Sequence, residues 1–430
     1  MKGMLPYLLS AVLILSLTGY LAGEELPTPT ATLSLEEVIN IALENQVDVL
    51  VGQNNLDAAQ NRVTQSKSRY FPQISVQNNT FTSSSGDALT QRRTGTAIAV
   101  THNIYDGGLR EANIARTKHG VTENEAALAR TIQAVVFDTT SAYYEVLRAK
   151  QLAEVAQASV KYNEALIEVV QSRVELGDAA SVDILPVQSQ LAAAKVNLIA
   201  AQNSVRVAKI RLQNTIGLSP QAEFDVQPIS TPPSAELQAL ETYLSEAMNN
   251  RPDISQAQAA IGSSKASAKA AKISLYPIPQ VTAEYQRGLG GLSGNSTQIF
   301  GGISFNLFDG GANRAAYREA KANQESAEKR HQQLIKDIEA QVRQAHINVN
   351  DSIERLSASQ IGLETAQKNY EVQQERYKQG LAIPLDLLNA EVQVVTAQTN
   401  LVQAQYDLYI AMAQLDFAVG RNGVQNGKQD

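Results

Sequence analysis

The sequence predicts a mostly α-helical α+β membrane protein made of two similar halves, each with one β-hairpin and several long helices. Three observations favour this fold class. A set of motifs occurs twice in one register, proline is missing from two long stretches, and tryptophan is absent while Ala and Gln are abundant. Large side chains that fill a wide core are therefore scarce, and small or polar helix formers are plentiful, as in long thin helices.

The first residues have the pattern of a secretory signal peptide, which we predict to span residues 1–23. Lys2 precedes an apolar run from Leu5 to Leu17, and small residues follow up to Gly23. This run is shorter than the ~18 residues that a membrane-spanning helix needs, and no later stretch reaches that length. We expect export from the cytoplasm and no transmembrane helix. The chain has no cysteine, so a disulfide framework and a thiolate metal site are excluded.

An internal repeat divides the rest of the chain. The motif Asn-Ile-Tyr-Asp-Gly-Gly at 103–108 recurs 203 residues later as Asn-Leu-Phe-Asp-Gly-Gly at 306–311. The same offset carries Arg173, Gly177, Asp183, Leu185 and Gly217 onto Arg376, Gly380, Asp386, Leu388 and Gly420. A proline-rich linker at 218–234 separates the copies. We therefore predict a first structural repeat at 24–217, a second at 235–420 and a C-terminal tail at 421–430.

Each repeat is expected to begin with a helical segment and a β-hairpin. The segments 34–69 and 236–275 have helical patterns, the second broken at Pro252. Alternating apolar residues then predict hairpins at about 72–105 and 279–308: Ile74, Val76, Ile98 and Val100 in the first, and Val281, Ala283, Tyr285, Ile299, Ile303, Phe305 and Leu307 in the second. Between the strands, stretches rich in Gly and Ser predict polar turns.

Each hairpin ends at an Asp-Gly-Gly sequence, Asp106-Gly107-Gly108 or Asp309-Gly310-Gly311. An Asp at this place can accept hydrogen bonds from the free N–H groups at the start of a helix. The following residues, 107–176 and 310–379, remain compatible with helix throughout. At ~1.5 Å per residue, each helix would be ~105 Å long, which few globular proteins need.

A shorter helix should follow each long one, at 180–216 and 383–419, after a tip turn at Gly177 or Gly380. Its apolar residues have seven-residue spacing: Ile184, Leu191, Leu198, Val205 and Leu212, and then Leu387, Val394, Leu401, Leu408 and Leu415. We expect a second row, Leu385, Leu388, Val392, Val395 and Val402, to complete a coiled-coil seam. The shorter helices should therefore pack lengthwise against the long ones.

Four short strands leave a sheet with two open edges, and in lipid every backbone group needs a partner. Further copies of the chain must therefore close the sheet. Two copies would give eight strands, and a barrel of about that size is filled by its own side chains. A conducting barrel needs three copies or more.

The doubled Asp-Gly-Gly turn and the doubled tip motif Arg-x-x-x-Gly-x-x-x-x-x-Asp-x-Leu resemble those of the TolC-like outer-membrane efflux proteins, over roughly 33–420. The resemblance implies a homotrimer with a twelve-stranded outer-membrane β-barrel, four strands per chain, continued by a long periplasmic α-helical coiled-coil barrel. It also implies an exit duct of a tripartite efflux or type I secretion system. Its partners would be a periplasmic adaptor protein, an inner-membrane transporter and outer-membrane lipid.

The resemblance assigns a periplasmic gate, or pore constriction, to Asp183, Asp386 and Tyr377. The family's arginine and second aspartate are replaced by Ala382 and Asn389, so closure should involve fewer polar ties, with no arginine beside the Tyr377 hydroxyl. From the residues alone, Asp183 and Asp386 also suit a helix start, where the macrodipole favours acids. Tyr377 likewise suits coiled-coil packing.

Other function classes have less support. No nucleophile motif or metal-ligand spacing is present, so we expect no enzyme, no cofactor and no metal. Basic residues are scattered, which argues against nucleic-acid binding. A non-conducting structural or adhesive coiled-coil protein of the envelope would not need two amphipathic hairpins. A periplasmic binding protein would need a concave site and an apolar core that the low aromatic content does not supply.

Overall fold

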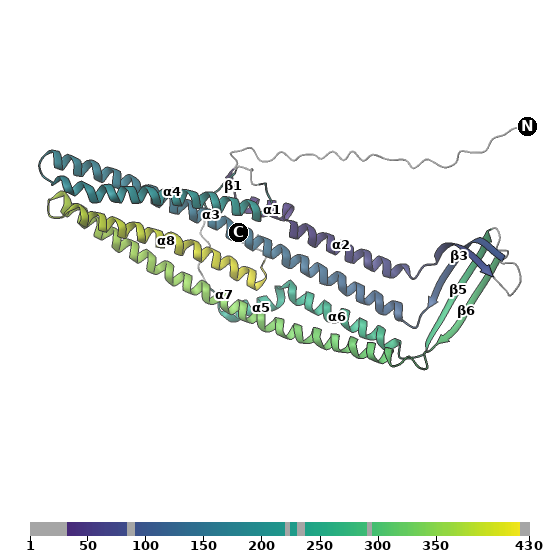
Figure 1. The fold of residues 1–430 in the computed structure, drawn as a ribbon. Coiled ribbons are helices and arrows are strands. Elements are labelled where there is room, and N and C mark those ends of the chain that lie inside the picture. Colours follow the sequence, from purple (N-terminus) through teal and green to yellow (C-terminus); the bar gives the residue numbers. More distant parts are fainter. Residues whose placement is uncertain (1–31, 84–90, 220–223, 230–236, 290–294, 422–430) are drawn as a thin grey trace, which may run out of the picture.

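The computed structural model describes residues 32–83, 91–219, 224–229, 237–289 and 295–421. They form one elongated body in which long helices run side by side and a β-sheet lies at one end (Figure 1). The predicted signal peptide, the two hairpin turns and nearly all of the predicted tail lie outside the described residues.

The elements follow the order expected for two repeats. The first contains β1 (Thr32–Leu33), α1 (Leu35–Asn45), α2 (Val47–Ser68), β2 (Gln73–Ser83), β3 (Gln91–Tyr105), α3 (Leu109–Glu175), a 3-10 turn (Ser181–Asp183) and α4 (Ile184–Thr215). The second contains β4 (Asp225–Val226), α5 (Leu240–Asn250), α6 (Pro252–Ile273), β5 (Ile278–Leu289), β6 (Asn295–Ser304), α7 (Ala312–Lys378) and α8 (Pro384–Val419).

Several predicted bounds need correction. The long helices α3 and α7 begin two residues later than expected, because both glycines of each Asp-Gly-Gly turn have positive φ, from 66° to 90°, which a right-handed helix excludes. Strand β6 ends at Ser304, so Phe305 and Leu307 lie beyond the strand. The first helical segment is broken at Gln46, which has extended backbone and accepts a hydrogen bond from the N–H of Asp48 through its side chain.

The contacts between helices define two edges of the body. Near the sheet, α3 packs between α2 and α6, and α6 also contacts α7. Toward the other end, α3 packs between α4 and α8, and α8 packs along α7. Helices α2 and α4 therefore form one edge of the chain, and α7 forms the other (Figure 1).

The predicted second coiled-coil row is partly wrong. Leu388 is buried, but Leu385 and Val392 are exposed. Helix α8 buries the stripe that contains Leu387, Leu388 and Glu391. Because each helical residue turns ~100° from the last, Leu385 and Val392 point away from that stripe.

Strands β2, β3, β5 and β6 form an antiparallel sheet in the order β2-β3-β5-β6. The pairing places Val76 opposite Ile98, Val100 opposite Tyr285, and Ala283 opposite Ile299. Since side chains alternate along a strand, these residues share one apolar face, and Gln, Ser, Thr, Ala and Gly occupy much of the other. Among the described residues, no helix has the length and apolar character needed to cross a bilayer.

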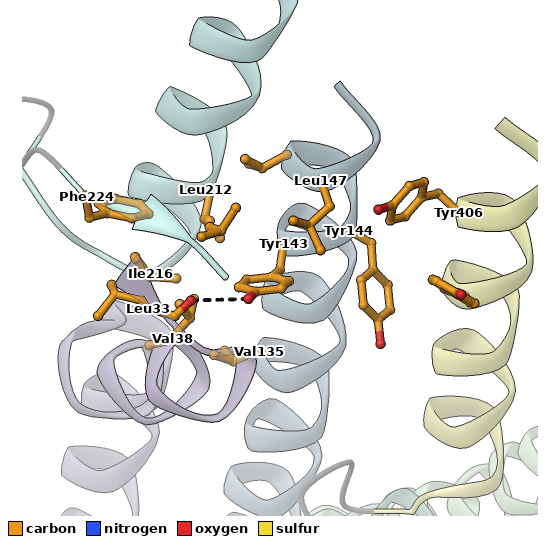
Figure 2. Packing of buried hydrophobic residues seen from close by; sticks show 14 of the residues in the cluster. Leu33, Val38, Val135, Tyr143, Tyr144, Leu147, Leu212, Ile216, Phe224 and Tyr406 are labelled. Carbon is orange, nitrogen blue, oxygen red and sulfur yellow. Dashed lines mark hydrogen bonds between the residues drawn. The ribbon is translucent and has the colours of Figure 1, made fainter. Parts of the chain in front are cut away.

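A core near the middle of α3 holds the two repeats together (Figure 2). Tyr143 is buried there, and its hydroxyl lies 2.7 Å from the carbonyl oxygen of Gln227 and 3.2 Å from that of Leu33. Strands β1 and β4 pair in parallel beside it. The start of the first repeat, at Leu33, and the linker, at Gln227, are thus both held by Tyr143 on α3.

Candidate functional site

The helix hairpins α3–α4 and α7–α8 turn at the end of the body opposite the sheet (Figure 1). Gly177 and Gly380 lie at these turns with φ of 83° and 76°. Glycine has no side chain to oppose this left-handed conformation, so both long helices can end sharply here. We use "tip" for these two turns and the first turns of α4 and α8.

Asp183 and Asp386 occupy equivalent places at the tip. The Asp183 carboxylate accepts a hydrogen bond from the N–H of Ala180 at 3.2 Å, and Asp386 accepts one from the N–H of Ile383 at 3.2 Å. Both acids therefore have the helix-start geometry that their sequence position favours. The Asp386 side chain is nevertheless exposed, so its charge is available to solvent at the tip.

Tyr377 lies in a buried apolar cluster formed by the two hairpins. Its ring packs with Leu166, Val170, Val187, Leu387 and Leu388. Its hydroxyl has no hydrogen-bond partner among the described residues. Burial raises the pKa of Tyr377; Arg173 opposes this and Asp183 adds to it, which places both groups near the ring. Packing is thus the role of Tyr377 within one chain.

Arg173 makes a polar tie between the hairpins at the tip, a role that sequence reasoning missed. Its guanidinium donates to the carbonyl oxygens of Tyr377 and Lys378 at 3.0 and 3.2 Å, and lies 4.4 Å from the centre of the Tyr377 ring. Arg173 thus approaches the face of the Tyr377 ring, while the Tyr377 hydroxyl, which Ala382 leaves without the family's arginine, has no hydrogen-bond partner among the described residues. Arg173 opens the repeated tip motif, and this was the available signal.

The strand-to-helix turns hold the predicted aspartates at the helix starts. Asp106 accepts from the N–H of Arg110 at 3.0 Å, and Asp309 accepts from Gly311 and Asn313 at 2.9 and 3.0 Å. Gly108 and Gly310 have positive φ at these turns. The two aspartates thus cap the first turns of α3 and α7.

Among the described residues, an arginine side chain holds the first of these turns, and no arginine hydrogen bond is found at the second. Arg110 is buried, donates to the carbonyl oxygens of Arg69, Asn103 and Ile104 at 3.0 to 3.3 Å, and lies 3.9 Å from the centre of the Tyr70 ring. The repeat places Asn313 at the equivalent position. The second turn is therefore exposed in the single chain.

Comparison with known proteins gives consistent results. The family model for outer membrane efflux proteins matches residues 38–218 and 243–421. The chain is 24% identical to the outer membrane efflux protein BepC of Brucella suis, covering 83% of this chain and 78% of BepC. It is 23% identical to the outer membrane protein TolC of Vibrio cholerae, covering 90% of each.

Solved structures show the same fold. The chain is similar to CusC, with a TM-score of 0.80 and 17% identity, over 90% of this chain and 92% of that one. It is also similar to the outer membrane protein VceC of Vibrio cholerae, with a TM-score of 0.77 and 18% identity, over 90% and 96% of the two chains. With the family model matching both repeats, the chain belongs to the outer membrane efflux protein family.

Proposed function

We propose that three copies of this outer-membrane protein close into a tube that passes exported molecules from an inner-membrane transporter, through a periplasmic adaptor, to the exterior. One observation carries the proposal. The surface that α8 buries against α3 within the chain has an exposed counterpart on α4, at the chain's edge.

The repeat offset makes the comparison direct. Leu388 and Val402 on α8 are buried or half-buried, and their counterparts Leu185 and Ile199 on α4 are 60% and 63% exposed. Tyr144 on α3 packs against α8 through Tyr409. Its counterpart on α7 is Ile347, which is 60% exposed. Helix α7 corresponds to α3 in the repeat, and α4 corresponds to α8. A contact like that between α3 and α8 can therefore form between α7 of one copy and α4 of the next.

Such a contact joins two different surfaces. A head-to-tail interface gives a ring if the rotation closes and a filament if it does not. The sheet can also join head to tail. Its two edges are β2 and β6, and β2 of one copy can pair with β6 of its neighbour. Eight strands would leave a filled barrel, so three copies and twelve strands are the smallest open tube.

The tip is then the narrow end of the tube. Three copies of Asp183 and Asp386 would surround one axis, and a ring of acids favours cations over anions. Arg173 ties the two hairpins of each copy together, which supports a closed resting tip. The doubled turns at Asp106 and Asp309 would connect the barrel to the helical tube.

The name of one relative suggests the direction of transport. A relative from Pseudomonas putida, 24% identical over 89% of this chain, is a pyoverdine export outer membrane protein. We propose export rather than uptake for the present chain.

Conductance of the purified protein in planar bilayers tests this function. We expect a small, cation-preferring conductance from a detergent-extracted trimer that fractionates with the outer membrane. A monomer that stays soluble without detergent and does not conduct would contradict the proposal. That result would favour the structural or adhesive coiled-coil alternative.

A further inference from the structure

A carboxyl group is buried between the two repeats, close to the tip. Glu391 is 4% exposed and lies on the stripe of α8 that packs against α3. It is seven residues from the first residue of α8, or ~10 Å at ~1.5 Å per residue. Few glutamates are this buried without a cationic partner, and among the described residues none forms an ion pair with Glu391.

The polar groups around Glu391 come from one turn of α3. Ser159 donates to Glu391 Oε1 at 2.7 Å, and Asn163 donates through its Nδ2 to the carbonyl oxygen of Ser159 at 2.8 Å. Asn163 is fully buried. Two buried acceptors, Glu391 Oε2 and Asn163 Oδ1, have no hydrogen-bond partner among the described residues.

A proton on Glu391 would turn the unpaired acceptor Oε2 into a donor. A neutral Glu391 could donate through Oε2, whereas an ionised carboxylate can only accept. Burial raises the pKa of Glu391, although the hydrogen bond from Ser159 opposes the rise. The donor groups thus come from α3, and the group they surround comes from α8.

The other ionisable groups near Glu391 do not account for a change of charge near neutral pH. Tyr162 on α3 and Tyr370 on α7 lie nearby with ring centres 5.4 Å apart, and burial raises the pKa of both phenols further above neutrality. Toward α4, Glu164 and Lys195 pair with each other at 3.1 Å on the surface. Neither tyrosine changes charge near neutral pH.

We propose that Glu391, Ser159 and Asn163 form a proton-binding site that couples pH to closure of the tip. The inference rests on the proposed channel function. If opening moves α8 away from α3, Glu391 becomes hydrated and regains an ordinary pKa, so the closed tip binds the proton more tightly.

The sign of the effect follows from this difference. Closure gains stability from Glu391 below its ordinary pKa of about 4.3, and loses it as pH rises to the raised value of the closed state. The channel should therefore open more often as pH rises. Each unit of pKa difference changes the closed-to-open ratio about tenfold per carboxyl.

Glu391→Gln separates the proton from the shape of the side chain. An amide can accept from Ser159 and carries N–H donors in place of Oε2 at every pH. We expect this variant to stay in the low-conductance state from pH 4 to pH 8, while wild type opens with rising pH. Glu371→Gln removes the same charge from an exposed position on α7 and should keep the wild-type pH profile.

Ser159→Ala is a second test variant, and we expect it to shift the pH profile of conductance instead of abolishing it. It removes a donor that favours the ionised carboxylate, so the midpoint of the pH profile should move to higher pH. A merely structural role of Ser159 would change conductance without moving the midpoint. An unchanged pH profile in Glu391→Gln would overturn the proposal.

Infrared difference spectra between acid and neutral pH make the test independent of conduction. The C=O band of a protonated carboxyl that titrates above its ordinary pKa should be present in the wild-type difference spectrum and absent from that of Glu391→Gln. If the wild-type protein did not conduct, the proposed channel function would be refuted. The infrared spectrum would still show whether Glu391 binds a proton. If wild type conducted but both tests failed, only the proton site would be refuted.

Discussion

Removing the Arg173 side chain should open the tip. In one chain its guanidinium donates to the carbonyl oxygens of Tyr377 and Lys378 at 3.0 and 3.2 Å and stacks on the Tyr377 ring. Hydrogen bonds from a charged donor contribute ~1.5 to 3 kcal/mol each when buried. Arg173 is half-exposed, so ~1 kcal/mol for each bond is a better estimate.

The stacking adds ~0.5 kcal/mol, the low end for an exposed cation over an aromatic ring. Solvent screening reduces the sum further, and we take ~2 kcal/mol per copy for Arg173→Ala. Because ~1.4 kcal/mol is a factor of ten, the closed-to-open ratio should fall about 30-fold for each copy. The mean conductance in planar bilayers should rise accordingly.

Two comparisons make the result specific. Arg173→Lys keeps the charge but loses the planar group, and should lie between wild type and Arg173→Ala. Lys368→Ala removes one charge from an exposed ion pair on α7 and should change nothing. Equal conductance of wild type and Arg173→Ala, with the trimer intact, would refute the tie between the hairpins.

Three further changes have defined outcomes. Asp386→Asn should weaken block of the channel by divalent cations applied from the tip side, measured as a higher blocking concentration; unchanged block would leave Asp386 as a helix-start residue only. Tyr143→Phe removes a buried hydroxyl 2.7 Å from the Gln227 carbonyl and should lower the free energy of unfolding by ~1 to 2 kcal/mol in detergent, by urea titration. Gly107→Ala should lower trimer yield after refolding, because φ is 72° and a Cβ would lie 2.7 Å from an Ile278 methyl carbon; a wild-type yield would contradict this.

The repeat and its long helices could be predicted because proline, glycine and apolar spacing act locally. The break at Gln46 could not, since no proline or glycine marks it and the extended backbone depends on a glutamine side chain capping the next helix. Pro252, at the start of α6 in the other repeat, marked the corresponding break directly. Local rules thus located one break and missed its counterpart.

The tip shows the same division. The acids at 183 and 386 and the glycines at 177 and 380 were identifiable because the motif occurs twice. Arg173 was present in that motif, but its partners are backbone carbonyls 204 and 205 positions away, which no spacing reveals. The sequence repeat did not reveal Glu391 either. Its counterpart in the first repeat, Gln188, is exposed, so a polar residue at this position gave no sign of burial.

The cysteine-free chain allows a direct test of the closed ring of three copies. Within one chain, Ser159 contacts Glu391 at 2.7 Å. The repeat offset carries Ser159 to Gly362 on α7 and Glu391 back to Gln188 on α4. A Cβ at Gly362 meets nothing within 4 Å, so a cysteine fits there.

The measurement is cross-linking of the double variant Gln188→Cys/Gly362→Cys in native outer membranes with a short bifunctional thiol reagent. We predict covalent dimers and trimers on a denaturing gel and no larger species, because a ring of three uses all its interfaces. Each single variant should remain monomeric. Double-variant chains that stay monomeric, or that form a ladder beyond the trimer, would contradict a closed ring of three copies.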